Sequence, residues 1–373
     1  MNKENLTAYE VVTEENLTDI HSTGWLLRHK KTGARVMLIE NDDENKVFNI
    51  AFRTPPKDST GVAHILEHSV LCGSREFPLK DPFVELVKGS LNTFLNAMTY
   101  PDKTCYPVAS CNDKDFSVNL MHVYLDAVFY PNIYKREEIF RQEGWNYHLE
   151  QKEGPLKYNG VVYNEMKGAF SSPDEVLERE IMNHLFPDTT YGCESGGDPK
   201  NIPDLTYENF LNFHRTYYHP SNSYIYLYGN MDMEEKLAFL DEHYLSHFDY
   251  LDVDSVIQEQ KAFGACRDVT LEYPVAENEG EEDNTYLSYN MVVGNAADSQ
   301  MAMAFEVLDY ALLSAPGAPL KQALLDVKAG KDVYGSYDDG ILQPYFTVIA
   351  KGSNPDRKEE FVSVIRQVLG EYC

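Results

Sequence analysis

Hydrophobic and polar positions alternate along the first part of the chain. Residues 22–55 carry apolar side chains at nearly every second position, with polar turn sequences at 31–33 and 41–45. A period of two is typical of strands that bury one face. The pattern therefore predicts a β-hairpin or a meander over this region.

After these strands the spacing of apolar residues becomes helical. A helix is expected to begin near Gly61, capped by Ser59 or Thr60. Apolar residues between Phe83 and Leu95 predict a second helix over 81–98, with Pro82 in its first turn. Further helices are predicted over 113–129, 135–144, 162–186, 206–217 and 233–245, and extended segments over 99–110, 145–151 and 221–230.

A similar order of elements begins again late in the chain. We predict a first domain over 1–250, a linker over 251–265 and a second, homologous-looking domain over 266–373. Interleaved helices and strands indicate an α+β fold with mostly antiparallel sheets backed by helices. The second domain is short and ends on a helix, so we expect it to be truncated. Its strands are predicted at 267–275, 284–293, 332–338 and 342–351, and its helices at 297–314, 318–328 and 356–371.

Composition narrows the possible partners and the compartment. The chain has 32 Lys and Arg against 60 Asp and Glu, a net charge of −28, which argues against nucleic acid and anionic membranes. No stretch approaches the roughly 20 apolar residues of a membrane span. The polar N-terminus does not resemble a secretory signal. The six cysteines lack a CxxC pair, so we expect reduced thiols in a cytoplasmic protein.

The strongest chemical signal is the segment His64-Ile65-Leu66-Glu67-His68. On a helix, His64 and His68 lie one turn apart on one face, so their imidazoles can bind one metal ion. Glu67 points to nearly the same side and can act as general base on a water molecule at the metal. The helix is otherwise largely apolar, and burying ionisable groups is costly unless they are paired or bind metal.

A catalytic zinc site needs a third protein ligand and an open position for water. Glu165 is the candidate, because it lies in the first turn of an apolar-faced helix. Spacing alone cannot select it from so many acidic residues. Two histidines and one carboxylate favour Zn²⁺, with one ion per chain.

Other histidines serve as a control for this interpretation. His243 and His247 have the same spacing of four but no inner glutamate, and they lie in a polar, acidic stretch. We interpret them as a solvated helix end. His214 and His219 lie among aromatic residues and are interpreted as packing or capping residues. The loop at 195–199 lacks the lysine of a phosphate-binding loop and is interpreted as a turn that lines a cavity.

Three blocks of sequence together resemble one protein family. They are residues 64–110, beginning HILEHSVLCGS, residues 160–177, GVVYNEMKGAFSSPDEVL, and residues 191–199, YGCESGGDP. In this order they resemble the presequence-protease branch of the pitrilysin/insulysin metallopeptidases, which are inverzincins with an HxxEH motif. The resemblance covers most of 15–250 and extends more weakly into 266–373.

The resemblance implies a zinc endopeptidase that degrades unfolded oligopeptides inside a chamber. Two halves, each a pair of related α+β domains, form that chamber. The zinc ligands map onto His64, His68 and Glu165, and the general base maps onto Glu67. An edge strand that pairs with the substrate backbone maps onto Asn96, Ala97, Met98 and Thr99. Binding by strand addition reads backbone more than side chains.

Two features depart from the family pattern. Tyr158 stands where many relatives have a further glutamate, seven residues before the distal ligand. Family members are usually far longer, and their C-terminal half supplies an arginine and a tyrosine that hold the substrate. We therefore expect this chain to need a C-terminal half of the same protein, or a partner subunit, and to be weakly active or inactive alone.

Two alternatives to a general peptide-degrading enzyme stay open. One is a non-catalytic scaffold or peptide-binding subunit of the same fold. The other is a processing peptidase that cuts one site in a defined partner. The intact set of ligands and base favours an enzyme over a scaffold, whereas only substrate profiling separates degradation from processing.

Overall fold

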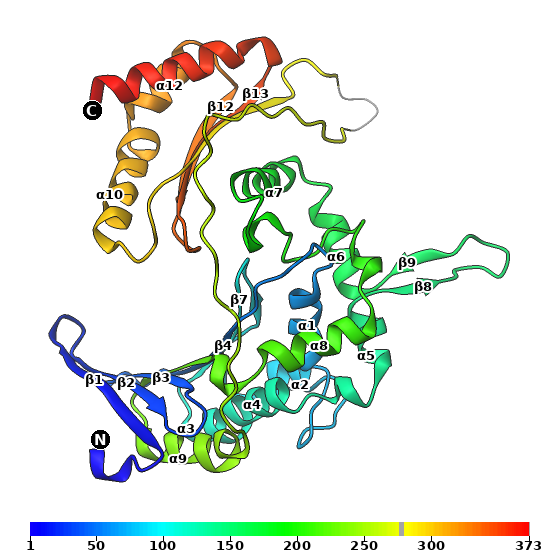
Figure 1. Cartoon of the computed structure of the whole chain (residues 1–373). Helices are drawn as coiled ribbons and strands as arrows, with labels where there is room; N and C mark the ends of the chain where they lie inside the picture. Colours follow the sequence, from blue (N-terminus) through cyan, green and yellow to red (C-terminus); the bar gives the residue numbers. More distant parts are fainter. Residues whose placement is uncertain (276–279, 373) are drawn as a thin grey trace. The chain divides into compact units, whose positions relative to one another are not determined.

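A computed structural model describes residues 1–275 and 280–372 of the chain. It divides into two compact units, one made of Met1–Gly168 and Cys193–Val256 and the other of Ala169–Gly192 and Ile257–Cys373. Each unit combines a sheet with helices (Figure 1), which confirms the predicted α+β fold. None of the described helices is both long and apolar enough to cross a membrane.

An eight-stranded sheet forms the frame of the first unit, in the order β1-β2-β3-β10-β4-β7-β5, with β6 also paired to β7. All pairs are antiparallel except β10 with β3. Because β10 lies between β3 and β4, the strands expected as a meander are neighbours only from β2 to β3. The strands are β1 (Tyr9–Leu17), β2 (Ser22–His29), β3 (Arg35–Glu40), β4 (Lys46–Arg53), β5 (Asn92–Leu95), β6 (Met98–Thr99), β7 (Lys103–Ser110) and β10 (Ser223–Gly229).

Helices pack on this sheet and close the core of the first unit. Burial alternates along β4, where Phe48, Ile50 and Phe52 are fully buried. Ile65 and Leu66 of α1 are equally buried and belong to the same core. The helices of this unit are α1 (Val62–Val70), α2 (Pro82–Gly89), α3 (Asp113–Asp115), α4 (His122–Phe129), α5 (Glu137–Glu143), α6 (Val161–Ala169), α8 (Tyr207–Tyr217) and α9 (Met233–His243).

The single helix predicted over 81–98 is wrong beyond its first half. Pro82 begins α2 as expected, and Asp81 caps it by accepting a hydrogen bond from the backbone N–H of Val84. The helix ends at Gly89, and the chain then forms β5 and β6 against β7. Glycine, serine, asparagine and threonine are weak helix formers, so pairing with β7 outweighs the apolar spacing.

The long helix predicted over 162–186 is also wrong. It is two helices, α6 and α7 (Pro173–Leu185), because a proline starts a new helix and disfavours helical backbone before it. The second helix belongs to the second unit, where Phe186 and Tyr191 pack in a cluster with Ile341. The sequence predicts two contiguous domains, whereas residues 169–192 belong to the same unit as residues 257–373.

The second unit has a three-stranded antiparallel sheet in the order β11-β13-β12. Its strands are β11 (Thr285–Val292), β12 (Asp332–Asp338) and β13 (Tyr345–Ser353), and its other helices are α10 (Ser299–Asp309), α11 (Pro319–Asp326) and α12 (Lys358–Tyr372). The strand predicted over 267–275 is wrong, because that described segment has no strand partner. Pro274 cannot donate to a ladder there.

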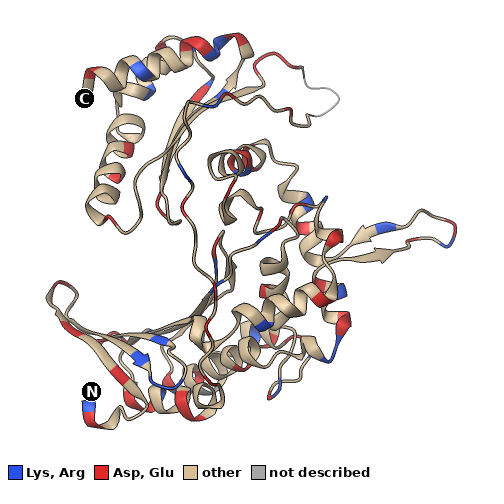
Figure 2. Ribbon diagram, in the orientation of Figure 1, with Lys and Arg blue, Asp and Glu red and all other residues tan. Residues whose placement is uncertain are grey.

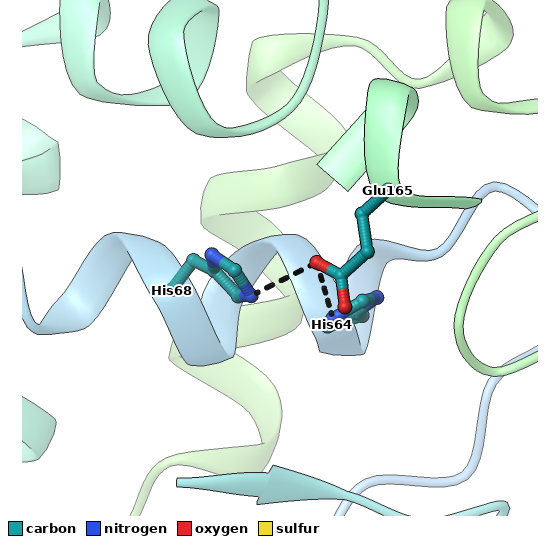
Figure 3. Close-up of side chains that lie close together, drawn as sticks. All are labelled: His64, His68 and Glu165. Carbon is teal, nitrogen blue, oxygen red and sulfur yellow. Dashed lines mark ion pairs between the residues drawn. The ribbon is translucent and has the colours of Figure 1, made fainter. Parts of the chain in front are cut away.

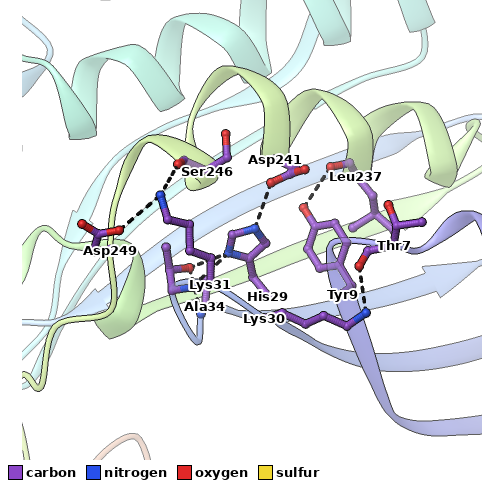
Figure 4. A network of polar contacts seen from close by, with 11 residues as sticks. Thr7, Tyr9, His29, Lys30, Lys31, Ala34, Leu237, Asp241, Ser246 and Asp249 are labelled. Atoms are coloured by element: carbon purple, nitrogen blue, oxygen red, sulfur yellow. Dashed lines mark hydrogen bonds and ion pairs between the residues drawn. The ribbon is translucent and has the colours of Figure 1, made fainter.

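The first unit also contains a two-stranded hairpin and a buried polar network. The hairpin of β8 (Asn146–His148) and β9 (Lys157–Asn159) projects from this unit (Figure 1) and stacks Tyr147 on Tyr158 with ring centroids 5.5 Å apart. Elsewhere, His29 on β2 lies 2.9 Å from Asp241 on α9 (Figure 4). Its other ring nitrogen lies 2.7 Å from the Thr32 hydroxyl. His29 and Thr32 are buried, so this network joins β2 to α9 inside the first unit.

Acidic side chains are distributed over helices and loops of both units (Figure 2), in line with the net charge of −28. The described cysteines are free thiols: Cys72, Cys105, Cys111, Cys193 and Cys266. Cys373 lies outside the described residues.

Candidate metal centre

Helix α1 starts in a tight contact with the loop at 194–198. Neither Ser59 nor Thr60 caps the helix, so that prediction is wrong: the Ser59 hydroxyl accepts from the N–H of Glu194. The N-cap is Gly61, with φ of 69°. A Cβ there would lie 2.7 Å from the Cα of Gly197, so the close approach requires glycine.

The three predicted ligand side chains converge (Figure 3). The Nε2 atoms of His64 and His68 each lie 3.8 Å from Oε2 of Glu165, which reaches them from α6. Tetrahedral ligands about 2.05 Å from zinc lie roughly 3.3 Å apart. The two nitrogen–oxygen distances are wider than that, and all three ligand atoms lie within 4.8 Å of one another, so side-chain movements would be needed to complete a tetrahedral site. The Glu165 side chain is 55% exposed, which leaves one side open to water.

Both imidazoles have their second nitrogen engaged. Nδ1 of His64 lies 3.0 Å from the carbonyl oxygen of Gly196, and Nδ1 of His68 lies 3.4 Å from Oε2 of Glu143. An acceptor at Nδ1 favours the tautomer whose Nε2 lone pair is available to a metal. Sequence reasoning missed Gly196 and Glu143 as partners, because neither belongs to the motif and their approach depends on distant segments.

The acidic surroundings change the pKa of His68. Burial disfavours the charged imidazolium, but the contact with Glu143 and the charges of Glu67 and Glu165 outweigh it, so the pKa of His68 is raised. Burial would raise the pKa of Glu143 as well, yet the contacts with His68 and Gln142 lower it. A cation would bind the neutral imidazole of His68 through Nε2, in place of a proton on that atom.

Glu67 lies on the same helix as the two histidines and is largely buried. Its Oε2 accepts a 2.7 Å hydrogen bond from the hydroxyl of Thr99 on β6. A cavity of about 290 Å³ adjoins it, lined in part by Glu67, His68, Phe83 and Ala97. That volume suits one amino-acid side chain better than a larger ligand.

The predicted substrate strand lies at one end of the large sheet. Met98 and Thr99 form β6 and pair with Cys105 and Thr104 of β7, and the N–H of Asn96 donates to the carbonyl of Pro107. Ala97 lies between them and lines the cavity. Among the described residues, no further strand pairs with β5 or β6 on the side away from β7. This edge of the sheet can therefore accept a peptide as an added strand.

The control histidines have other surroundings. The ring of His243 stacks on Phe239 with centroids 4.5 Å apart, and α9 ends at His243 before reaching His247. His214 is buried between the hydroxyl of Tyr134 and the carbonyl of Val128, and His219 caps a short turn. Within the described residues, the group with metal-binding geometry is His64, His68 and Glu165.

Comparison with known proteins agrees with this fold. Residues 52–193 match the family model described as insulinase (peptidase family M16), and residues 204–373 match the M16 inactive domain. Two consecutive segments of the chain therefore match models of the same family. The chain belongs to the M16 peptidase family, with presequence-protease-type relatives.

Two relatives and two structures illustrate the match. The chain is 56% identical to the protein HypA of Clostridium perfringens, covering 97% of this chain and 37% of the relative. It is 47% identical to presequence protease 1 of Arabidopsis thaliana, covering 97% and 34%. Pitrilysin matches with a TM-score of 0.64 at 15% identity, over 92% of this chain and 35% of that one. An M16 inactive domain from Pseudomonas fluorescens matches with a TM-score of 0.69 at 16% identity, over 94% and 79%. The chain thus spans about a third of the length of the curated relatives.

Proposed function

We propose that this chain carries the zinc site of an endopeptidase that hydrolyses unfolded oligopeptides. The observation that supports the proposal is the convergence of His64, His68 and Glu165, with Glu67 on the same helix. Two imidazoles and one carboxylate suit Zn²⁺, and we expect one ion per chain. We assign catalysis to the first unit, which contains all four of these residues, and a non-catalytic role to residues 257–373, which lie within the segment that matches the inactive-domain model.

Zinc, when bound, polarises the scissile carbonyl and acidifies water. Glu67 takes the proton from the attacking water and passes it to the leaving amine. The Thr99 hydroxyl holds Oε2 of Glu67, so we assign the proton transfer to Oε1. Burial of Glu67 limits its motion, which keeps the carboxylate pointed at the reacting groups.

The substrate binds as an added strand along Asn96, Ala97, Met98 and Thr99, where backbone hydrogen bonds supply most of the affinity. One of its side chains enters the cavity beside Glu67 and His68. Because the relative from Arabidopsis is named a presequence protease, presequence-like peptides are the first substrates to test. A C-terminal half, or a partner subunit, completes the chamber.

The test combines metal analysis with a cleavage assay. The purified chain is analysed for zinc and incubated with a fluorogenic unfolded peptide, alone and with the remaining part of the Clostridium perfringens relative. Zinc near one ion per chain, with cleavage that rises on adding that part, supports the proposal. Absence of zinc in the folded chain overturns it. If the chain binds zinc but cleaves no peptide, either alone or with that part, the non-catalytic, peptide-binding alternative is favoured.

A further inference from the structure

We infer that Glu143 is a positioning residue that holds His68 with its Nε2 atom directed at the metal. This inference rests on the proposed function, because the metal ion is part of that proposal. It extends the site to α5, an element that the HxxEH motif does not include.

Glu143 is the last residue of α5 and only 6% exposed. Its Oε2 lies 3.4 Å from Nδ1 of His68, while Oε1 accepts hydrogen bonds from Gln142 at 2.8 Å and the Cys72 thiol at 3.6 Å. Cys72 lies two residues after the end of α1, so the carboxylate joins the end of α5 to the end of the ligand helix. Both carboxylate oxygens therefore have fixed partners.

A buried carboxylate is costly unless it is paired, and the ion-pair partner of Glu143 is His68. An acceptor at Nδ1 keeps the proton on that nitrogen and restricts rotation of the ring. Carboxylate partners of metal-binding histidines generally raise the basicity of the ligand and strengthen metal binding. The position of Glu143 thus has a direct consequence for zinc affinity.

The two ligand histidines are held by different kinds of acceptor. Nδ1 of His64 meets the neutral carbonyl of Gly196, which no side-chain substitution removes. Nδ1 of His68 meets a charged side chain, which a substitution can remove. Variants of Glu143 should therefore alter His68 and leave His64 unchanged, a pattern that a general loss of packing would not produce.

The experiment measures zinc dissociation constants of the full chain by competition with a chromophoric chelator. Glu143→Ala is expected to weaken zinc binding about 10- to 100-fold, and Glu143→Gln less, because its amide oxygen can still accept from Nδ1. Glu137→Gln is the matched control, since Glu137 lies on the same helix in an exposed pair with Arg141. Thermal melting of each variant verifies that it is folded.

A second measurement needs no variant. In the chain labelled with ¹⁵N-histidine, metal-free and above the pKa of His68, the proton of this ring is expected on Nδ1. A proton on Nε2 overturns the inference, as does zinc affinity of folded Glu143→Ala within twofold of the parent chain. If the parent binds no zinc, the proposed function fails, and the tautomer of His68 still decides the role of Glu143.

Discussion

The chain contains two pairs of histidines spaced four residues apart, His64 with His68 and His243 with His247, and the two pairs differ in backbone conformation and surroundings. Helix α1 continues through His64 and His68, so both rings leave the same face. Helix α9 ends at His243, and the backbone turns away at Tyr244 before His247. Equal spacing in sequence therefore produces a shared face only where the helix is continuous.

The partners of the two pairs differ as well. Each ring of the first pair has an acceptor at Nδ1 and faces the carboxylate of Glu165. The ring of His243 instead stacks on Phe239. A metal site thus needs acceptors and a third ligand from other elements in addition to the motif.

Replacing His68 by alanine is expected to have the largest effect. Removing a ligand should weaken zinc binding by more than about 100-fold, beyond the loss typical of an indirect partner. Zinc content, measured by mass spectrometry, should fall from about one ion per chain to nearly none. His243→Ala is the matched control and should keep its zinc. An equal loss of zinc from His68→Ala and His243→Ala would show that the two histidine pairs do not differ in metal binding.

Replacing Glu67 by glutamine separates metal binding from catalysis. The variant should keep its zinc, because Glu67 is not a proposed ligand. Its kcat on an unfolded peptide should fall about 10²- to 10⁴-fold, since glutamine cannot accept the proton. The assay includes the C-terminal part of a relative, and Glu85→Gln, exposed on α2, is the control. Full turnover of Glu67→Gln would exclude Glu67 as the base.

His214 represents a third environment, a buried neutral histidine. Burial lowers its pKa from 6.5 to about 4. The unfolded chain therefore binds a proton that the folded chain excludes between these values, and stability is lost as pH falls from about 6.5 to 4. The loss from this group should reach about 3 kcal/mol. Denaturant unfolding of the metal-free chain at several pH values measures it.

The control for this prediction is His214→Gln. This variant lacks the titrating ring, so its free energy of unfolding should depend less on pH over the same interval, whatever its absolute stability. An unchanged pH dependence would show that other groups, rather than His214, determine acid sensitivity.

The smallest effect is expected at Thr99. Thr99→Val removes the hydroxyl that donates to Glu67 while keeping the shape of the side chain. A hydrogen bond to a charged group contributes about 1.5 kcal/mol, so kcat/KM should fall roughly tenfold with zinc content unchanged. Thr99→Ser keeps the hydroxyl and should stay close to the parent. Equal activity of all three chains would exclude this role.

Much of the fold follows from local patterns. The alternation in β2 and β4 and the apolar spacing in α8, α11 and α12 predicted those elements, because burial of one face repeats with the period of the backbone. The helices predicted over 81–98 and 162–186 were wrong because helical spacing of apolar residues continues there through weak helix formers in the first case and through a proline in the second. The strand expected over 267–275 had a suitable pattern but no neighbour to pair with.

The motif on α1 could be recognised from local sequence, because the histidines and the base lie within one helical turn and their arrangement depends only on local backbone geometry. It also pointed to Glu165 through resemblance. The groups that contact that helix depend on the packed fold: they are the carbonyl of Gly196, the carboxylate of Glu143 and the hydroxyl of Thr99. These contacts join segments 32 to 132 residues apart, and such approaches arise from packing of the whole core rather than from any local pattern.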